Sequence, residues 1–104
     1  MVQRAGTVSD QVLDSENLST ADSLNNRADR YYAMGQYERA LPLLQRALRI
    51  REKVLGPWDL ATAQTLNDLA IVYKTMRQPE QGLPLAQRAL DIREKARGLS
   101  DPMT

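Results

Sequence analysis

The residue types and spacings in this chain of 104 residues do not assemble a catalytic constellation. Histidine and cysteine are both absent, which excludes the commonest general bases, thiolate nucleophiles and transition-metal ligands. No spacing pairs two carboxylates for acid–base work among Asp14, Glu16, Asp22 and Asp29, all of which we expect to be exposed. Glycine occurs singly and never in a phosphate-binding loop. We therefore predict that the chain is not an enzyme, and we expect no cofactor and no bound metal.

Side chains suited to binding recur at a fixed spacing. Asn25 and Asn67 are 42 residues apart, and a primary amide both donates and accepts hydrogen bonds, so it can hold a peptide backbone of any sequence. Their surroundings recur too: LNNRADRYYAMGQYERALPLLQRALRIREKVLG, from Leu24, returns from Leu66 as LNDLAIVYKTMRQPEQGLPLAQRALDIREKARG. A period of this length is typical of units that bury their apolar faces only by stacking on a neighbouring copy.

The spacing of apolar and small residues, in steps of three and four, predicts four helices. The first is expected to begin near residue 18 and to end in a turn at Gly35, where glycine can adopt a positive φ. The second is expected to stop at Gly56-Pro57. Asp59 is a plausible N-cap for the third, and Gly98 is expected to close the fourth.

The repeat also predicts the domain organisation. We expect a flexible leader and then a repeat array, with boundaries at 1–16 for the leader, 17–104 for the array, about 18–56 for the first repeat, about 60–98 for the second and 101–104 for a truncated third. The closing DPMT places a capping aspartate before a proline, as at the start of a helix. An alternative for the leader is the end of an earlier helix, because a Val-Leu pair precedes Val54-Leu55 by 42 residues.

Charge and hydropathy narrow the possible partners. The formal net charge is +1, which does not favour nucleic acid. The runs QRALRIREK and QRALDIREK place basic residues on the second helix of each pair, but Glu52, Asp91 and Glu94 interrupt them, so a solvated face is expected. No apolar run approaches the roughly 20 residues that span a bilayer. We expect a soluble, cytoplasmic protein with no membrane insertion.

The predicted unit of two helices joined by a short glycine turn, with small residues where the helices cross, resembles the tetratricopeptide repeat. The 42-residue spacing and the pattern LNN-x-A-x-x-Y-x-x-x-G-x-Y-x-x-A-x-P-L-x-x-R-A-L-x-I-R-E-K-x-L-G look like the kinesin light chain and nephrocystin subgroup. The resemblance covers residues 18–104 and implies an all-α fold, a superhelical solenoid of two helical hairpins plus the start of a third repeat.

The resemblance also implies a binding surface. In such arrays the first helix of each pair lines a concave groove that holds an extended peptide or a helix of a partner protein. The candidate partner-binding residues are then Asn25, Asp29 and Tyr32 in the first copy and Asn67, Ile71 and Lys74 in the second. We therefore expect a protein–protein interaction scaffold.

The second copy departs from the pattern where its helices should pack. Arg77, Pro79, Gly82 and Ala86 replace Gly35, Tyr37, Ala40 and Leu44. These changes remove side-chain volume, so we expect looser packing in the second pair. In the first copy, Arg27 stands where the second has Leu69.

Two alternative functions remain open. The chain could be a structural element that self-assembles end to end, through an outer face of the last helix that carries Leu83, Leu90 and Ala96. An RNA-binding helical repeat is the other alternative, and the balanced charge disfavours it. Trp58, in the loop between repeats, is expected to cover the ends of adjacent helices, with a role in partner contact as the alternative.

Overall fold

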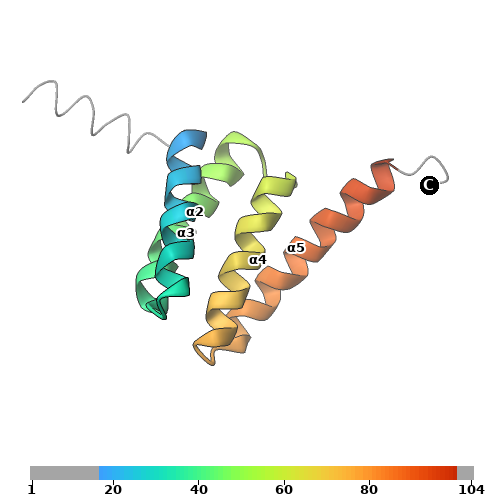
Figure 1. The fold of residues 1–104 in the computed structure, drawn as a ribbon. Helices are drawn as coiled ribbons and strands as arrows, with labels where there is room; N and C mark the ends of the chain where they lie inside the picture. The colour runs from blue at the N-terminus through green and yellow to red at the C-terminus, as the bar shows by residue number, and fades with distance from the viewer. Residues whose placement is uncertain (1–16, 101–104) are drawn as a thin grey trace, which may run out of the picture.

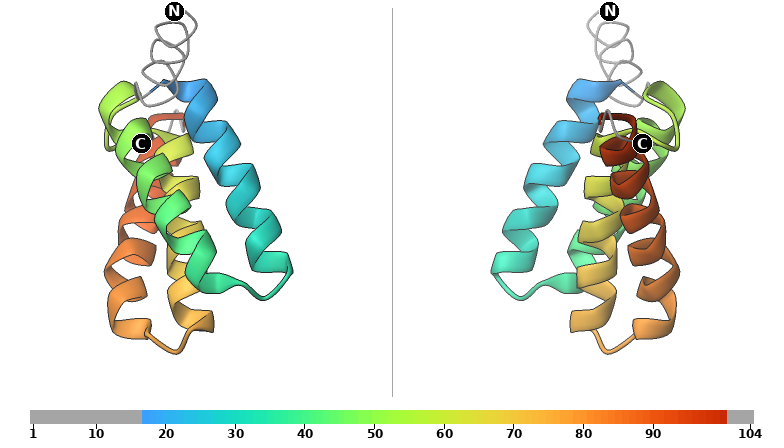
Figure 2. Two further views of the ribbon diagram at one scale, coloured as in Figure 1. Left: turned by 90° about the vertical axis from the view of Figure 1, so that its left-hand side faces the viewer. Right: turned by 90° about the vertical axis from the view of Figure 1, so that its right-hand side faces the viewer.

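The computed structural model describes residues 17–100, and it contains four helices and no strand in that range. The helices are α2 (Leu18–Ala33), α3 (Tyr37–Val54), α4 (Leu60–Thr75) and α5 (Pro79–Ser100). They form two antiparallel hairpins, α2–α3 and α4–α5, that stand side by side with their tight turns at the same end of the molecule (Figures 1 and 2). The predicted all-α class is confirmed. The predicted leader and truncated third repeat lie outside the described residues.

Capping side chains set where the first helix of each hairpin begins. Asn17 Oδ1 accepts a hydrogen bond from the Thr20 amide at 2.9 Å, ahead of α2. Asp59 Oδ1 accepts from the Ala61 amide at 2.8 Å, which confirms the predicted cap of α4. Each bond satisfies one of the backbone donors that a helix leaves free at its N-terminus.

Residues with positive φ make the turns. Gly35 (φ 78°) and Gly56 (φ 98°) follow α2 and α3, as expected. Arg77 occupies the position of Gly35 in the second hairpin and is forced to φ 65°. The prediction that Gly98 ends the last helix is wrong, because α5 continues to Ser100 and Gly98 is not among the positive-φ glycines of the described chain.

Both second helices contain a proline at the same register. Pro42 is the sixth residue of α3 and Pro84 the sixth of α5, and each helix continues past it. A proline there removes one backbone hydrogen bond from the helix. Its recurrence in both copies makes it a feature of the repeat.

The core is divided into three parts. Each hairpin has an internal cluster, formed by Ala21, Leu24, Ala47 and Ile50 in the first and by Ala63, Leu66, Ala89 and Ile92 in the second. A third group, the central cluster, joins the hairpins and consists of Ala28, Ala40, Leu44, Leu69, Val72 and Tyr73. Helix α4 therefore packs against both helices of the first hairpin, and each fully buried leucine there contributes about 1.5–3 kcal/mol of transfer free energy.

Gly82 brings α4 and α5 into close contact. A Cβ at this position would lie 3.0 Å from the carbonyl oxygen of Ala70 and 3.3 Å from Tyr73 Cβ. The space that a side chain at residue 82 would need is thus occupied mainly by the backbone of Ala70. Gly82 therefore allows a close approach of the two helices at this position, whereas Pro79 and Ala86 line a hollow of about 340 Å³ between the same helices.

Candidate functional site

A recess lies between α2 and α4, the first helices of the two hairpins. Its volume is about 100 Å³, and it is lined by Ala28, Asp29, Tyr32, Leu44, Asp68, Ile71 and Val72. The recess has an apolar floor from the central cluster and two carboxylates, Asp29 on α2 and Asp68 on α4. Three of the predicted partner-binding residues, Asp29, Tyr32 and Ile71, contribute to it.

Asn25 does not lie on the open surface. It is only 4% exposed. Its Nδ2 donates to Asp68 Oδ2 at 3.0 Å, and its Oδ1 accepts from Thr65 Oγ1 at 3.1 Å and from Arg51 Nη1 at 3.3 Å. The prediction that this amide holds a partner's backbone is corrected: α4 covers it, and the amide instead connects the two hairpins.

Arg51 completes this network and is a residue that the sequence reasoning missed. It is 7% exposed, and its Nη1 donates to Thr65 Oγ1 at 2.7 Å while its Nη2 pairs with Asp22 Oδ1 at 2.8 Å. Helical spacing carried the signal, since Arg51 follows buried Ala47 by four residues and buried Leu44 by seven. A basic residue at a core register is expected to be paired.

Asp68, which the sequence reasoning also missed, is the half-buried carboxylate of the recess. Burial raises the pKa of the Asp68 carboxyl above its ordinary value, and the charge of Asp29 raises it further. The hydrogen bond from Asn25 and the charges of Arg51 and Arg93 act in the opposite direction and are outweighed. Asp29 and Asp68 both line the recess, so a cation placed there would be attracted by two carboxylates.

Tyr32 closes one end of the recess. Its hydroxyl shares a 3.0 Å hydrogen bond with Thr75 Oγ1 on α4, and its ring lies 5.1 Å from that of Tyr37, with an interplanar angle of 55°. Tyr32 is half-buried and lines the recess. Asp29, one turn earlier, is exposed.

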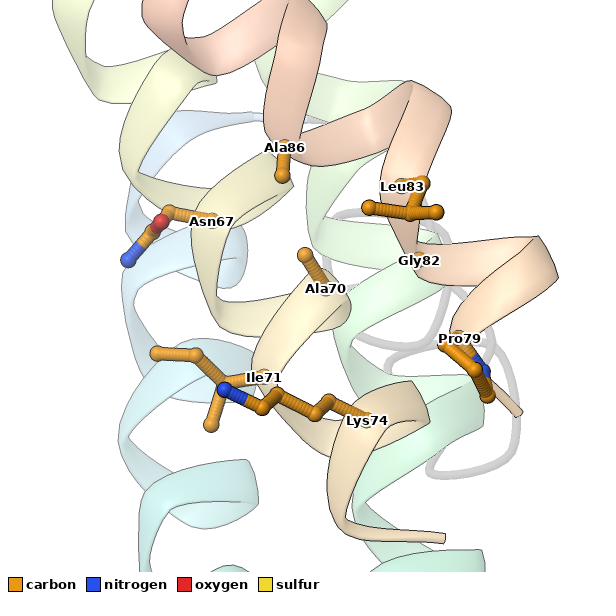
Figure 3. A pocket seen from close by; sticks show the side chains of 8 residues that line it. All are labelled: Asn67, Ala70, Ile71, Lys74, Pro79, Gly82, Leu83 and Ala86. Carbon is orange, nitrogen blue, oxygen red and sulfur yellow. The ribbon is translucent and has the colours of Figure 1, made fainter. Parts of the chain in front are cut away.

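A second hollow lies between α4 and α5 (Figure 3). Its volume is about 340 Å³, and it is lined by Asn67, Ala70, Ile71, Lys74, Pro79, Gly82, Leu83 and Ala86. Asn67 and Lys74 belong here, and Ile71 is shared with the recess. The six predicted partner-binding residues are therefore divided: Asn25 is buried, and the other five border two depressions that share Ile71.

The three residues of the predicted self-association face lie on different sides of α5. Leu83 and Leu90 are exposed, at 66% and 46%, and lie seven residues apart on one side of the helix. Ala96 follows buried Ile92 by four residues and is half-buried, so the inclusion of Ala96 in that face is corrected. The exposed part of the face consists of Leu83 and Leu90.

Trp58 does not cover apolar helix ends as expected. It remains 56% exposed, and Lys95 Nζ lies 4.9 Å from the centroid of its ring. This cation–π contact links the loop between the hairpins to the last turns of α5.

A membrane-spanning helix and a cluster of metal-ligating side chains are both absent from residues 17–100. No helix there is long and apolar enough to cross a membrane. No group of three or more acidic side chains in that part of the chain is placed to hold a metal ion.

Comparison with known proteins identifies the family. A family model described as Tetratricopeptide repeat matches residues 3–53 and, in an overlapping match, residues 19–95. No curated protein matches the chain. The crystal structure of BtubC (BKLC) from P. vanneervenii is similar, with a TM-score of 0.74 and 25% identity, over 77% of this chain and 32% of BtubC. This chain thus spans about a third of that structure, and the predicted solenoid of helical hairpins is confirmed. The chain belongs to the tetratricopeptide repeat family.

Proposed function

We propose that this protein is a protein–protein interaction module that holds an extended peptide or a helix of its partner in the concave groove lined by α2 and α4. Repeats of this family generally mediate interactions between proteins. The 42-residue period further supports a place in the kinesin light chain and nephrocystin-like subgroup. A cytoplasmic protein of this kind would act by bringing other proteins together.

The observation that carries the proposal is the charge of the recess between α2 and α4. Asp29 and Asp68 line it together with Ile71 and Tyr32. The two carboxylates line the same recess, so a cationic group that entered would be attracted by both of them. The preferred ligand is therefore a segment with lysine or arginine next to an apolar side chain that contacts Ile71.

A peptide library tests this directly. Peptides selected on the whole chain should be enriched in lysine and arginine, and labelled peptides should lose about tenfold in affinity for the Asp29→Asn/Asp68→Asn double variant. In an NMR titration, the Ile71 and Tyr32 resonances should shift most. Both substitutions are isosteric, and Asp68→Asn keeps an oxygen that can accept from Asn25.

The matched control removes the same charge elsewhere. Asp91 and Glu94 are exposed on α5, and neither lines the recess. The Asp91→Asn/Glu94→Gln variant changes the net charge equally and should bind the selected peptides as the wild type does. Equal losses in the two double variants, or shifts confined to α3 and α5, would contradict the proposal.

A further inference from the structure

The hollow between α4 and α5 is the counterpart of the surface on which α4 itself is seated. Each of its eight lining residues lies 42 positions after a residue at the contact between α4 and the first hairpin. Ala70 and Ala86 correspond to Ala28 and Leu44 of the central cluster, and Asn67 corresponds to Asn25. Within residues 17–100, the first hairpin carries a helix on this surface and the second does not.

The polar half of that surface is also repeated. Arg51 and Asn25 bind Thr65 and Asp68 of α4. Their counterparts are Arg93 and Asn67. Arg93 follows Ala86 by seven residues, so it lies on the side of α5 that borders the hollow, and it is exposed.

We propose that the α4–α5 hollow is a docking site for an amphipathic helix of a partner protein, and that this helix resembles α4. The template is the contacting face of α4, in which Thr65 and Asp68 supply the polar contacts and Leu69 and Val72 the apolar ones. The occupant therefore carries an aspartate, a leucine one residue later and an apolar residue four positions after the aspartate. Its carboxylate pairs with Arg93 and Asn67, and Lys74, two turns farther along α4, adds positive charge to the lining of the hollow.

The hollow favours a larger apolar side chain than α4 presents. Ala86 stands where the first hairpin has Leu44, and Leu44 borders Val72 in the recess between α2 and α4. The side chain of the occupant that corresponds to Val72 thus meets the space left by the missing leucine. A phenylalanine there fills more of the hollow than a valine and gains contacts that a void lacks.

A second copy of this chain is a poor occupant. Helix α2 presents Arg27 and Arg30 at the positions of Leu69 and Val72. Both arginines are exposed, and docking α2 head to tail would bury them against Ala70 and Leu83 with no acidic residue lining the hollow. The same chain thus offers one helix that matches the hollow and one that does not.

These two helices supply matched probes. Labelled peptides of residues 59–76 (the α4 peptide) and 17–34 (the α2 peptide) are titrated into the whole chain and followed by fluorescence anisotropy. We expect saturable binding of the α4 peptide, at least about tenfold weaker binding of the α2 peptide, and several-fold tighter binding of an α4 peptide that carries Val72→Phe. Equal binding of the α4 and α2 peptides overturns the proposal.

Variants of the protein show whether the peptide binds in the α4–α5 hollow, at the surface of the first hairpin that α4 already covers, or in the recess between α2 and α4. Leu83→Asp places a charge in the hollow and should reduce binding of the α4 peptide at least about tenfold. Leu60→Asp is the control: Leu60 is 56% exposed in the first turn of α4, does not line the hollow, and should leave binding unchanged. If Leu83→Asp has no effect, the peptide has exchanged with α4 and the proposal fails.

A charge exchange tests the polar contact. Arg93→Glu should weaken the α4 peptide about tenfold, and a peptide with Asp68→Arg should recover most of that loss on the same variant. If the affinity does not recover, the contact between Arg93 and the aspartate of the peptide is wrong, and so is the proposed register of the docked helix. Dimerisation in sedimentation equilibrium that Leu83→Asp abolishes, without peptide binding, would show that the occupant is a second copy. Binding of cationic peptides in the recess does not depend on either result.

Discussion

Arg77 and Gly35 occupy the same turn position in successive hairpins and share the same left-handed backbone, with φ of 65° and 78°. Glycine adopts this conformation without steric cost, whereas a residue with a Cβ is strained by roughly 1–2 kcal/mol. The second hairpin therefore carries strain in its turn that the first lacks. The turn forms nevertheless, because α4 and α5 are held together by the packing on both sides of it.

Replacing Arg77 with glycine should stabilise the protein. We expect an increase of about 1 kcal/mol in the free energy of unfolding, since relief of strain outweighs the added freedom of the unfolded chain. Urea denaturation followed by circular dichroism measures it. The reciprocal change, Gly35→Ala, should destabilise by a similar amount through backbone strain alone, because no atom lies within 4 Å of the added Cβ. A neutral result for both would show that these turns tolerate either residue.

Asn25→Ala should be far more damaging than Asn67→Ala. The first substitution removes an acceptor of buried Arg51 and Thr65, and we expect a loss of about 2–3 kcal/mol. The second changes the 42-residue counterpart, which is half-buried at the edge of a hollow, and should cost less than about 0.5 kcal/mol. Thermal and urea unfolding of the pair gives the comparison. Equal effects would mean that the buried network adds nothing to stability.

Gly82→Val should separate the helices of the second hairpin. The new side chain would meet the Ala70 carbonyl, and we expect a loss of about 2 kcal/mol or more in the free energy of unfolding. Leu83→Val is the neighbouring control: this exposed site should change by less than about 0.5 kcal/mol. A Gly82→Val variant as stable as the wild type would show that α5 moves freely over α4.

Asp68 should make the protein relatively more stable at acidic pH. The pKa of Asp68 is raised in the fold, so the folded state holds this proton more tightly than the unfolded chain does. Its contribution is fully present below the ordinary pKa of 3.8 and is lost as pH rises through the higher folded value. The wild type should therefore lose stability relative to Asp68→Asn across that window, as measured by urea denaturation at successive pH values.

NMR titration of the carboxyl carbons checks the cause of this shift. Asp29→Asn should lower the pKa of Asp68, because it removes a neighbouring negative charge. Asn25→Ala should raise the pKa of Asp68, because it removes a hydrogen bond to the charged form. Shifts of the opposite sign would refute this account of the recess.

The helical hairpins could be predicted because their signals are local. The cap at Asp59 and the turn at Gly35 depend on residues close in sequence, and both are found in the structure. Gly98 shows where local reasoning fails. A glycine ends a helix only where the backbone turns to positive φ, and here it remains within α5.

The site was harder to predict because its character depends on contacts between hairpins. Asn25 and Asn67 look alike in sequence, but α4 buries the first and leaves the second at the edge of a hollow. Nothing near Asp68 in the sequence indicates that Asp29, on another helix, raises its pKa. These properties follow from the position of α4, which only the stacked structure supplies.

The buried guanidinium of Arg51 has a consequence for how such hairpins assemble. Its partners Asp22 and Asn25 belong to α2 of the same hairpin, whereas Thr65 Oγ1 and the Ala61 carbonyl belong to α4 and meet Arg51 only when α4 has one translation and one rotation relative to the first hairpin. Apolar ridges alone would permit slippage by a helical turn, whereas a slipped hairpin would remove the contacts of this buried cation with Thr65 and the Ala61 carbonyl. Arg51 therefore fixes the register of the two hairpins, because mis-stacked forms lose its polar contacts. The apolar contacts stabilise the stacking of the hairpins.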